Sequence, residues 1–453
     1  MPKEKQRTVS VAIAVFCAVF GLLFILCRSF AEENAGSEGL IYGMTSDGQG
    51  CVLLGIGDCT DKTIEIPSAY KGQPVLEIGR GAFLNDGTIE AVYFPSTIQK
   101  VGEEAFRNCT GLLDVGFNEG LTELGIGAFQ GCSSLMTAIL PSTLETVPEG
   151  AFSGCSALFE AVLPEVKEIG KDAFRNCSSL QALNLPEILK TVGVNAFREC
   201  RGLIAVSFPR SLERIEDGAF FGCDALYSVD LPAGMERIGD SAFSGCTSLS
   251  TLTLGENLGE LGEWAFSGCR ALKTASLPSG MGTIGDFCFA GCWSLTSFSF
   301  PADQNSIPDG MFEDCTALTA LTVNGTVSEL GDYSFYGCTG LNTLTFGDRL
   351  KRIGRSAFGG CPLEQLSYTG SRNPLAFLVL EPENEPVQSW LETNFQSAED
   401  VNGDGTVSIA DVTFVLDALS NGKDVPDLDG DCVGSISDVT RLLDILADRK
   451  SVV

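Results

Sequence analysis

Oxygen-bearing residues recur in a fixed order near the C-terminus, in the segment that begins at Asp400. Counting from Asp400, oxygen ligands fall at positions 1, 3, 5, 7, 9 and 12, and Gly405 at position 6 suits a sharp turn. Four residues would bind the ion through their side chains: Asp400, Asn402, Asp404 and Asp411. Thr406 would bind through its backbone carbonyl, and Ser408 through a bridging water. This order predicts a calcium-binding loop, with Asp in place of the usual Glu at position 12.

A second copy begins 27 residues later, at Asp427. Its predicted ligands occupy the same positions: Asp427, Asp429, Asp431 and Asp438 by side chain, Val433 by its carbonyl, and Ser435 at position 9. Cys432 stands where glycine is expected, so we predict a second calcium ion that binds more weakly than the first. Each loop precedes an apolar pattern with helical spacing, which predicts two loop–helix units within residues 398–450.

The 453 residues contain no histidine. This excludes Ser-His-Asp and Cys-His nucleophiles, histidine-ligated zinc and proton transfer through imidazole. We predict that the chain is not an enzyme. The alternative is a glycoside hydrolase that uses a pair of the scattered carboxylates in polysaccharide degradation.

The formal net charge of −30 at pH 7 argues against nucleic acid as a partner. Residues 1–31 have the features of an export signal: Lys3, Lys5 and Arg7, then an apolar run over 11–27, then a small-x-small cleavage site that ends at Ala31. We predict a secreted protein without a membrane span once this signal is cleaved. The alternative is that the apolar run is retained as an anchor.

A longer pattern occupies most of the chain. Thirteen times between Ile78 and Cys361 it repeats apolar-Gly-x-x-Ala-Phe-x-x-Cys and then Leu-x-x-Leu-x-Leu-Pro, with a spacing of 23 residues that shortens once to 22. The repeats, numbered here as coils 1 to 13, are marked by their phenylalanines: Phe83, Phe106, Phe129, Phe152, Phe174, Phe197, Phe220, Phe243, Phe266, Phe289, Phe312, Phe335 and Phe358. Such a period predicts stacked coils that bury one another's apolar faces.

Leu-x-x-Leu-x-Leu is the strand segment of a leucine-rich repeat, whereas the returning segment lacks the length and period of a helix. The fold class is therefore a parallel β-solenoid of about 13 coils plus a small all-α C-terminal module with two calcium loop–helix units. We expect an N-terminal cap over residues 32–77, the solenoid over 78–370, and a C-terminal cap and linker over 371–397.

Twelve of the 18 cysteines share one repeat position. They are Cys109, Cys132, Cys155, Cys177, Cys200, Cys223, Cys246, Cys269, Cys292, Cys315, Cys338 and Cys361. Parallel side chains on coils about 4.8 Å apart do not reach the Cβ separation of about 3.8 Å in disulfides, so we predict a ladder of buried thiols. Cys51 and Cys59, outside the ladder, are the candidate disulfide.

The outward strand positions differ along the stack. From the fifth coil on they hold small residues, whereas the first four coils have larger ones: Tyr93, Asp114, Ile139, Glu160 and Val162. Binding hot spots favour large side chains, so these five residues are the candidate ligand surface. The alternative is a spacer whose small residues merely suit a curved sheet. Trp264 and Trp293 lie in returning segments, where packing is favoured over sugar stacking.

The repeats resemble the BspA-type leucine-rich repeat family of secreted and surface bacterial proteins. The resemblance implies adhesion or protein recognition through the sheet face, with no shared chemistry.

The two calcium loop–helix units resemble the dockerin module, in a type I-like form. This resemblance implies calcium-dependent docking onto a cohesin module of a scaffold protein, as in a cellulosome, with Ile409, Ala410, Ile436 and Ser437 at the positions that help to select the cohesin. Together the resemblances predict an extracellular, scaffold-associated protein that presents its repeats to a protein or cell-surface ligand. A surface adhesin merely tethered by its dockerin is the further alternative.

Overall fold

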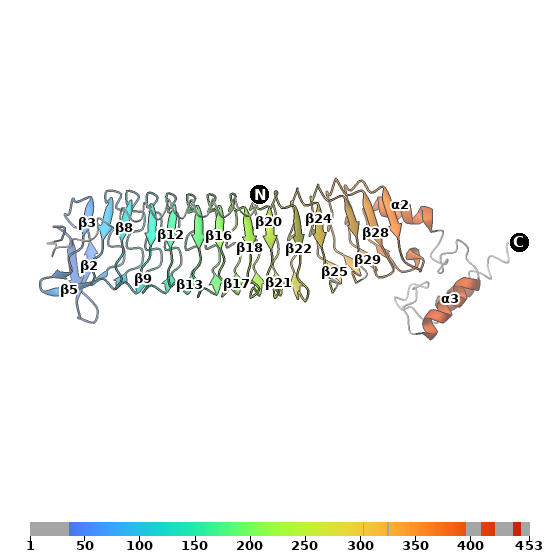
Figure 1. Ribbon diagram of the computed structural model, residues 1–453, viewed down its shortest axis with the longest axis horizontal. Coiled ribbons are helices and arrows are strands. Elements are labelled where there is room, and N and C mark those ends of the chain that lie inside the picture. The colour runs from blue at the N-terminus through green and yellow to red at the C-terminus, as the bar shows by residue number, and fades with distance from the viewer. Residues whose placement is uncertain (1–35, 302, 324–325, 396–408, 422–437, 445–453) are drawn as a thin grey trace, which may run out of the picture.

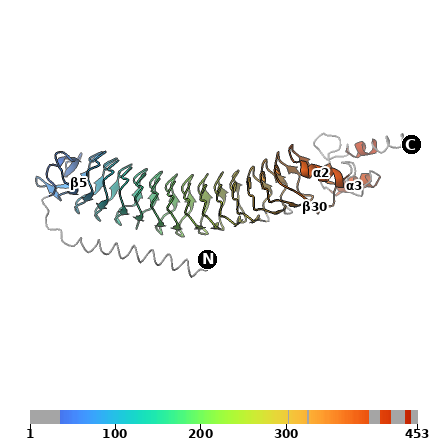
Figure 2. The ribbon, with the colours of Figure 1, turned by 90° about the horizontal axis from the view of Figure 1, so that it is seen from above.

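The computed structural model describes residues 36–301, 303–323, 326–395, 409–421 and 438–444. The chain winds into a leucine-rich repeat β-solenoid of about 14 turns, followed by helices near the C-terminus (Figure 1). Two rows of short strands run along the whole stack, one above the other in Figure 1, and the stack curves gently in Figure 2. The predicted export signal lies outside the described residues. Among the residues described, no helix is both long enough and apolar enough to cross a bilayer.

The upper row of Figure 1 is built from the Leu-x-Leu segments. Its strands are β3 (Thr63–Glu65), β6 (Ala91–Tyr93), β8 (Asp114–Gly116), β10 (Thr137–Ile139), β12 (Glu160–Val162), β14 (Ala182–Asn184), β16 (Ala205–Ser207), β18 (Ser228–Asp230), β20 (Thr251–Thr253), β22 (Thr274–Ser276), β24 (Ser297–Ser299), β26 (Ala320–Thr322), β28 (Thr343–Phe346) and β30 (Gln365–Tyr368). The strand pairs within this row are parallel and in register, as where Leu183 lies beside Val206. Leu183 points into the core while Ala182 and Asn184 point outward, the alternation that a strand requires.

The lower row holds the second strand of each coil, which is usually two residues long. Its strands are β2 (Cys51–Gly55), β5 (Gln73–Ile78), β7 (Lys100–Val101), β9 (Glu123–Leu124), β11 (Thr146–Val147), β13 (Glu168–Ile169), β15 (Thr191–Val192), β17 (Arg214–Ile215), β19 (Arg237–Ile238), β21 (Glu260–Leu261), β23 (Thr283–Ile284), β25 (Ser306–Ile307), β27 (Glu329–Leu330), β29 (Arg352–Ile353) and β31 (Val379–Leu380). Most of these strands are followed by a glycine with little room for a side chain: at Gly262 a Cβ would lie 2.5 Å from the backbone nitrogen of Asp240.

The returning segment of each coil consists of turns rather than helix. It is nevertheless joined to its neighbours by backbone hydrogen bonds, as where Phe220 N–H donates to the Ala242 carbonyl at 2.8 Å. Each coil is thus tied to the next along three sides. This explains how coils with so little regular structure can form a stack.

The repeated phenylalanines form a continuous stack through the core. Neighbouring rings lie 4.9–6.2 Å apart between centroids and are within 16° of parallel. Phe220 is fully buried between Phe197 and Phe243. Each ring therefore contributes to two coil interfaces.

Replacing Phe220 with alanine is expected to destabilise the solenoid by about 3–5 kcal/mol, because it leaves a cavity and removes two ring contacts. Guanidinium unfolding of the two proteins measures this difference. Phe221→Ala is the matched control, since this partly exposed ring contacts the Arg198 guanidinium at 3.9 Å and should cost about 1 kcal/mol or less. Equal losses in the two variants would contradict the central role of the stack.

The twelve ladder cysteines are buried free thiols, as predicted. Each directs its sulfur at the phenylalanine carbonyl of the preceding coil, at 3.0–3.4 Å. A weak S–H donor of small volume therefore satisfies a carbonyl that is closed off from water.

The predicted disulfide between Cys51 and Cys59 is wrong. Both residues are buried free thiols, and Cys51 on β2 directs its sulfur at the Tyr70 carbonyl, 3.7 Å away. The partner of this thiol is thus a backbone carbonyl of the cap and not a second sulfur.

The ends of the stack are covered by irregular segments. At the N-terminus β1 (Ile41–Met44) pairs antiparallel with β2, and β4 (Ala69–Tyr70) pairs antiparallel with β5. At the C-terminus a 3₁₀ turn, η1 (Pro374–Ala376), leads into β31, and α2 (Glu385–Asn394) buries Val387 and Leu391 against the core. Both segments predicted as caps add strands to the rows, so the turns number about 14 rather than the predicted 13.

A second, smaller apolar cluster lies in the C-terminal region. It joins α3 (Ile409–Ser420) to the helical residues 438–444 through Val412, Val415, Val439 and Leu442. The helical spacing in the sequence predicted both helices.

Candidate recognition surface

The five residues predicted as a ligand surface lie on strands β6, β8, β10 and β12, on the outward face of the upper row. Tyr93 donates a hydrogen bond from its hydroxyl to Asp114 Oδ2 at 3.2 Å, and its ring covers Gly116, where a Cβ would be 2.5 Å from Cδ1. Ile139 and Val162 are exposed partners in the parallel register. Glu160 is half-buried beside them, and burial raises the pKa of its carboxyl. The structure thus brings all five onto one face.

The sequence analysis missed three further residues of this face. Leu113, Met136 and Phe159, the residue just before each strand in coils 2 to 4, are 39%, 42% and 41% exposed. They are neighbours, because Met136 N–H donates to the Leu113 carbonyl at 3.1 Å and Phe159 N–H to the Met136 carbonyl at 3.0 Å. A signal was present in the sequence, because from coil 8 on this row has Ser250, Lys273, Thr296 and Thr319. Coils 6 and 7 still have large exposed residues there, Ile204 and Tyr227.

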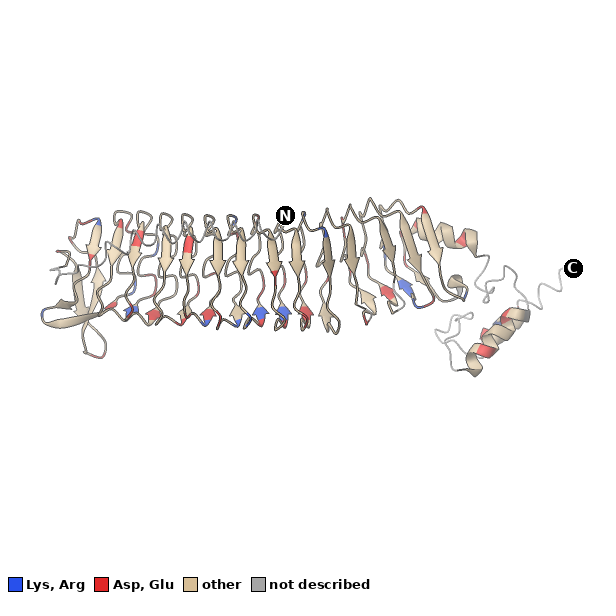
Figure 3. Ribbon diagram, in the orientation of Figure 1, with Lys and Arg blue, Asp and Glu red and all other residues tan. Residues whose placement is uncertain are grey.

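Together these side chains form a continuous apolar surface, the N-terminal patch. Its members are Tyr93, Leu113, Met136, Ile139, Phe159 and Val162, with Asp114 and Glu160 among them. Figure 3 shows the acidic residues of β8 and β12 on an upper row that is otherwise mostly uncharged, whereas the lower row carries many charges. Contiguous exposed apolar surface bordered by polar groups is typical of protein-binding sites.

The outward face of the later coils is different. From β20 to β26 its exposed residues are small and mostly hydroxylated: Thr251, Thr253, Thr274, Ser276, Ser297, Ser299, Ala320 and Thr322. Such side chains offer little area to a partner. The contrast between the two halves favours recognition by the first four coils.

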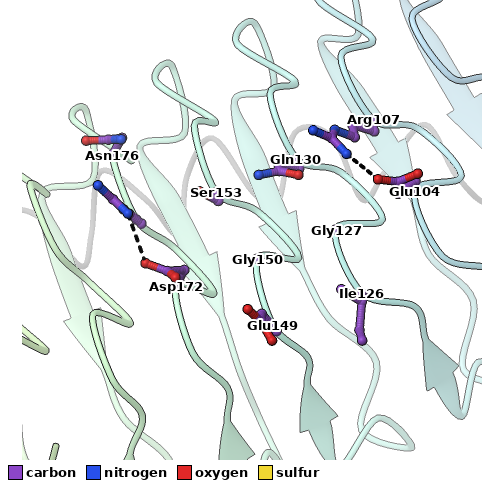
Figure 4. Close-up of a pocket in the computed structure, with 11 residues that line it drawn as sticks. Glu104, Arg107, Ile126, Gly127, Gln130, Glu149, Gly150, Ser153, Asp172 and Asn176 are labelled. Atoms are coloured by element: carbon purple, nitrogen blue, oxygen red, sulfur yellow. Dashed lines mark hydrogen bonds and ion pairs between the residues drawn. The ribbon is translucent and has the colours of Figure 1, made fainter. Parts of the chain in front are cut away.

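A hollow of about 470 Å³ lies on the returning segments of coils 2 to 5 (Figure 4). Among its carboxylates, Glu104 pairs with Arg107 and Asp172 lies 3.4 Å from Arg175. The third carboxylate of the lining, Glu149, lies 3.4 Å from the Lys171 ammonium of the next coil, so all three carboxylates have a basic partner. A glycosidase keeps one of its two carboxyl groups protonated, and a paired cation disfavours that protonation.

The predicted calcium sites are described only in part. Asp411 and Asp438, at position 12 of the two loops, are fully buried. The other predicted ligands, Asp400, Asn402, Asp404, Thr406, Ser408, Asp427, Asp429, Asp431, Val433 and Ser435, lie outside the described residues. Of the predicted cohesin contacts, Ile409 and Ala410 begin α3, while Ile436 and Ser437 lie outside. Within the described ranges no group of three metal-binding side chains occurs.

The sequence model described as the BspA type leucine rich repeat region (6 copies) matches residues 76–204, 190–319 and 305–375. These matches cover well over half of the chain. The chain belongs to the BspA-type leucine-rich repeat family. All six residues of the N-terminal patch fall within the family region.

The chain is also similar to solved structures. A leucine-rich repeat protein from Bacteroides ovatus is 26% identical, with a TM-score of 0.63 over 75% of this chain and 94% of that chain, and shows the same fold. A leucine rich cell surface protein from Faecalibacterium prausnitzii is 24% identical, with a TM-score of 0.47 over 78% of this chain and 99% of that chain. The search of curated protein sequences gave no match.

Proposed function

We propose that this BspA-type protein is an exported, non-catalytic recognition protein whose N-terminal patch binds a protein ligand, either free or on a cell surface. The observation that carries the proposal is the contiguous apolar surface of coils 2 to 4. Phe159 and Met136 supply area that would be desolvated on binding, and Tyr93 is an aromatic anchor already held by Asp114. Acidic groups within the patch, on a chain of net charge −30, suit a partner with a basic rim.

The patch can be removed without disturbing the fold. Met136→Ser together with Phe159→Ser gives coils 3 and 4 the residue that coil 8 has naturally at this position, Ser250. We expect binding of the labelled chain to intact bacterial and host cells, and to purified extracellular matrix proteins, to fall at least about tenfold. Lys273→Ser, in the same row of coil 9, is the matched control. Equal binding by all three proteins would exclude the patch as the site.

The second part of the proposal concerns attachment: residues 398–450 form a dockerin that binds a cohesin module of an extracellular scaffold. Several observations support it. The two helices are related by the 27-residue repeat of the sequence, and equivalent residues are buried alike: Val412 with Val439, and Val415 with Leu442. The exposed Leu416 and Leu443 also correspond.

The described part of each loop fits a calcium ion. Asp411 and Asp438 are wholly buried carboxylates at equivalent positions of the two loops, and carboxylate oxygens are the ligands that a hard cation such as Ca²⁺ prefers. The predicted loop ligands would hold one Ca²⁺ each. Cohesin binding that disappears on chelation and returns with added calcium tests this part. Cohesin binding that is unaffected by chelation would exclude it.

A further inference from the structure

One residue in each coil, two positions before the buried phenylalanine, has a left-handed backbone. Its φ lies between +49° and +62° in all thirteen coils. Five coils have glycine there, and others have residues such as Asp172 or Asn195, which tolerate this conformation. Coils 9, 10 and 12 instead have Trp264, Phe287 and Tyr333. Bulky side chains are disfavoured in this conformation, and such strain tends to persist at functional sites.

The three aromatic residues lie close to one another on the outside of the stack. Trp264 and Phe287 are stacked with centroids 4.2 Å apart and planes within 3°. The Phe287 ring then extends over coil 11, where a Cβ on Gly310 would lie 2.0 Å from its Cε1 atom. In coil 12 the rings of Tyr333 and Tyr336 pack edge to face, with their centroids 5.9 Å apart. These four residues are called the aromatic row.

Three of the four residues of the aromatic row are partly exposed to solvent, whereas Phe287 is less exposed because its ring lies between Trp264 and Gly310. Trp264, Tyr333 and Tyr336 are 39%, 37% and 43% exposed, so the prediction that Trp264 is a packing residue holds only for the ring face that Phe287 covers. On the other side of Trp264, coil 8 has the small residue Ser241 at the same left-handed position. Trp293 is 48% exposed but lies elsewhere in its coil, and the Arg270 guanidinium covers its ring at 4.1 Å.

Carboxylates held by backbone hydrogen bonds lie next to the aromatic positions in the sequence. The residue just before the aromatic position is acidic in coils 10 to 12. Asp286 Oδ1 accepts a hydrogen bond from Asp309 N–H at 3.1 Å, and Asp309 Oδ1 accepts one from Asp332 N–H at 2.7 Å. A carboxylate held through Oδ1 can still accept from a hydroxyl group at Oδ2. Asp332 Oδ1 also accepts from the Arg352 guanidinium at 3.1 Å, so the carboxylate charge of coil 12 is offset by an arginine. Asp286 and Asp309 are therefore the carboxylates of the row assigned as hydroxyl acceptors.

From these contacts we infer that the aromatic row is a second binding site, whose ligand is a neutral polysaccharide. Pyranose rings present C–H faces that pack on aromatic side chains, and their hydroxyl groups donate to carboxylates. The row follows the coils, which are roughly 5 Å apart, about the rise of one sugar unit in an extended chain, although coil 11 has Gly310 in place of a ring and is covered by Phe287. The carboxylates of coils 10 and 11, on a chain of net charge −30, disfavour anionic glycans and nucleic acid.

This site is independent of the N-terminal patch in position and chemistry. The patch is on the upper-row strands of coils 1 to 4, whereas the aromatic row is on the returning segments of coils 9 to 12. A recognition protein with both sites would hold a polysaccharide and a protein at the same time. Loss of one binding activity should leave the other intact.

Glycine substitutions test the inference cleanly. Because five coils have glycine at this position, Trp264→Gly and Tyr333→Gly remove the rings and relieve the left-handed strain together. The probes are three neutral polymers, barley β-glucan, xyloglucan and galactomannan, and one anionic polymer, polygalacturonate, in affinity gel electrophoresis of the full chain. We expect at least one neutral polymer, and not polygalacturonate, to retard the wild-type protein. The double variant should bind about tenfold more weakly.

Thermal unfolding of the same proteins separates binding from packing. We expect the double variant to unfold at the same temperature as the wild type or higher, and Ser241→Gly, the control in the same row, to bind as the wild type does. The inference is overturned if no neutral polymer retards the protein, or if the double variant binds normally. It is also overturned if the variant loses stability together with binding, or if sedimentation shows that the rings join two copies of the chain.

Discussion

Raising the pH from 8 to 10 is expected to unfold the solenoid, because its core is lined with thiols that cannot ionise where they lie. Burial raises the pKa of ten of these cysteines, in the case of Cys200 to about 12. Neighbouring carboxylates add to the effect of burial: Glu199 near Cys200, Asp224 near Cys223 and Cys246, and Asp314 near Cys315. In the unfolded chain a cysteine titrates near pH 8.5.

The sign of the effect follows from proton linkage. Above about pH 8.5 the unfolded chain loses thiol protons that the folded chain retains, so the free energy of unfolding falls as the pH rises. The contribution of these thiols is fully present below that pH. One pH unit above it, each thiol costs about 1 kcal/mol, and ten thiols cost on the order of 10 kcal/mol. This is as large as the net stability of a typical domain.

Guanidinium unfolding midpoints measured between pH 7 and pH 10 test this expectation. The matched control is a variant with serine at Cys200, Cys223, Cys246 and Cys269, since a serine hydroxyl can donate to the same phenylalanine carbonyls but does not ionise in this range. Its midpoint should fall less steeply with pH. Parallel pH dependence in the two proteins would show that the buried thiols do not control alkaline stability.

The period of the sequence predicted the solenoid because the buried phenylalanine is present in every one of the thirteen coils. Phe83 to Phe358 recur in register, and a ring at the same place in every coil can only stack on its neighbours. The same regularity predicted the thiol ladder. The sequence was less informative at the two ends of the solenoid, where the 23-residue period stops. The strands β3 and β31 belong to the segments predicted as caps, yet both extend the strand rows.

The surface was predicted only in part. Tyr93 and Ile139 were identified because they alternate with inward leucines, whereas Leu113, Met136 and Phe159 were missed because Leu-x-x-Leu does not say where its middle residues point. The disulfide predicted between Cys51 and Cys59 was wrong because their positions in the sequence do not reveal that Cys51 faces the Tyr70 carbonyl. The left-handed position of Trp264 had a usable signal, the glycines of the other coils in the same row.

The C-terminal module is small, so metal binding should decide whether it folds. Its described core consists of only four buried apolar side chains, Val412, Val415, Val439 and Leu442. Domains with so little buried area depend on metals or disulfides for stability. Within each predicted loop the acidic residues are close in sequence, and their carboxylates repel one another unless a cation is bound. Each site with a Kd one thousandth of the free calcium concentration adds about 4 kcal/mol.

Removal of calcium is therefore expected to unfold residues 398–450 while leaving the solenoid intact. Hydrogen–deuterium exchange of the full chain, with and without chelator, measures this directly. Peptides from α3 and residues 438–444 should lose protection, whereas peptides around Phe220 should not change. The same treatment should abolish cohesin binding. Protection of both helices that persists in chelator would contradict a calcium-dependent fold.

Single substitutions should separate the two loops. Asp411→Asn and Asp438→Asn each remove a buried charge at position 12, and Asp417→Asn and Asp444→Asn are matched controls because these residues are exposed on the same helices. Asp411→Asn should raise the calcium concentration required for protection of α3 at least about tenfold, since it would remove a charged ligand of the site that we propose to be the stronger one. Asp438→Asn should have a smaller effect, because Cys432 has already weakened the second loop. Larger effects from the two exposed controls than from Asp411→Asn would place the ion elsewhere in the module.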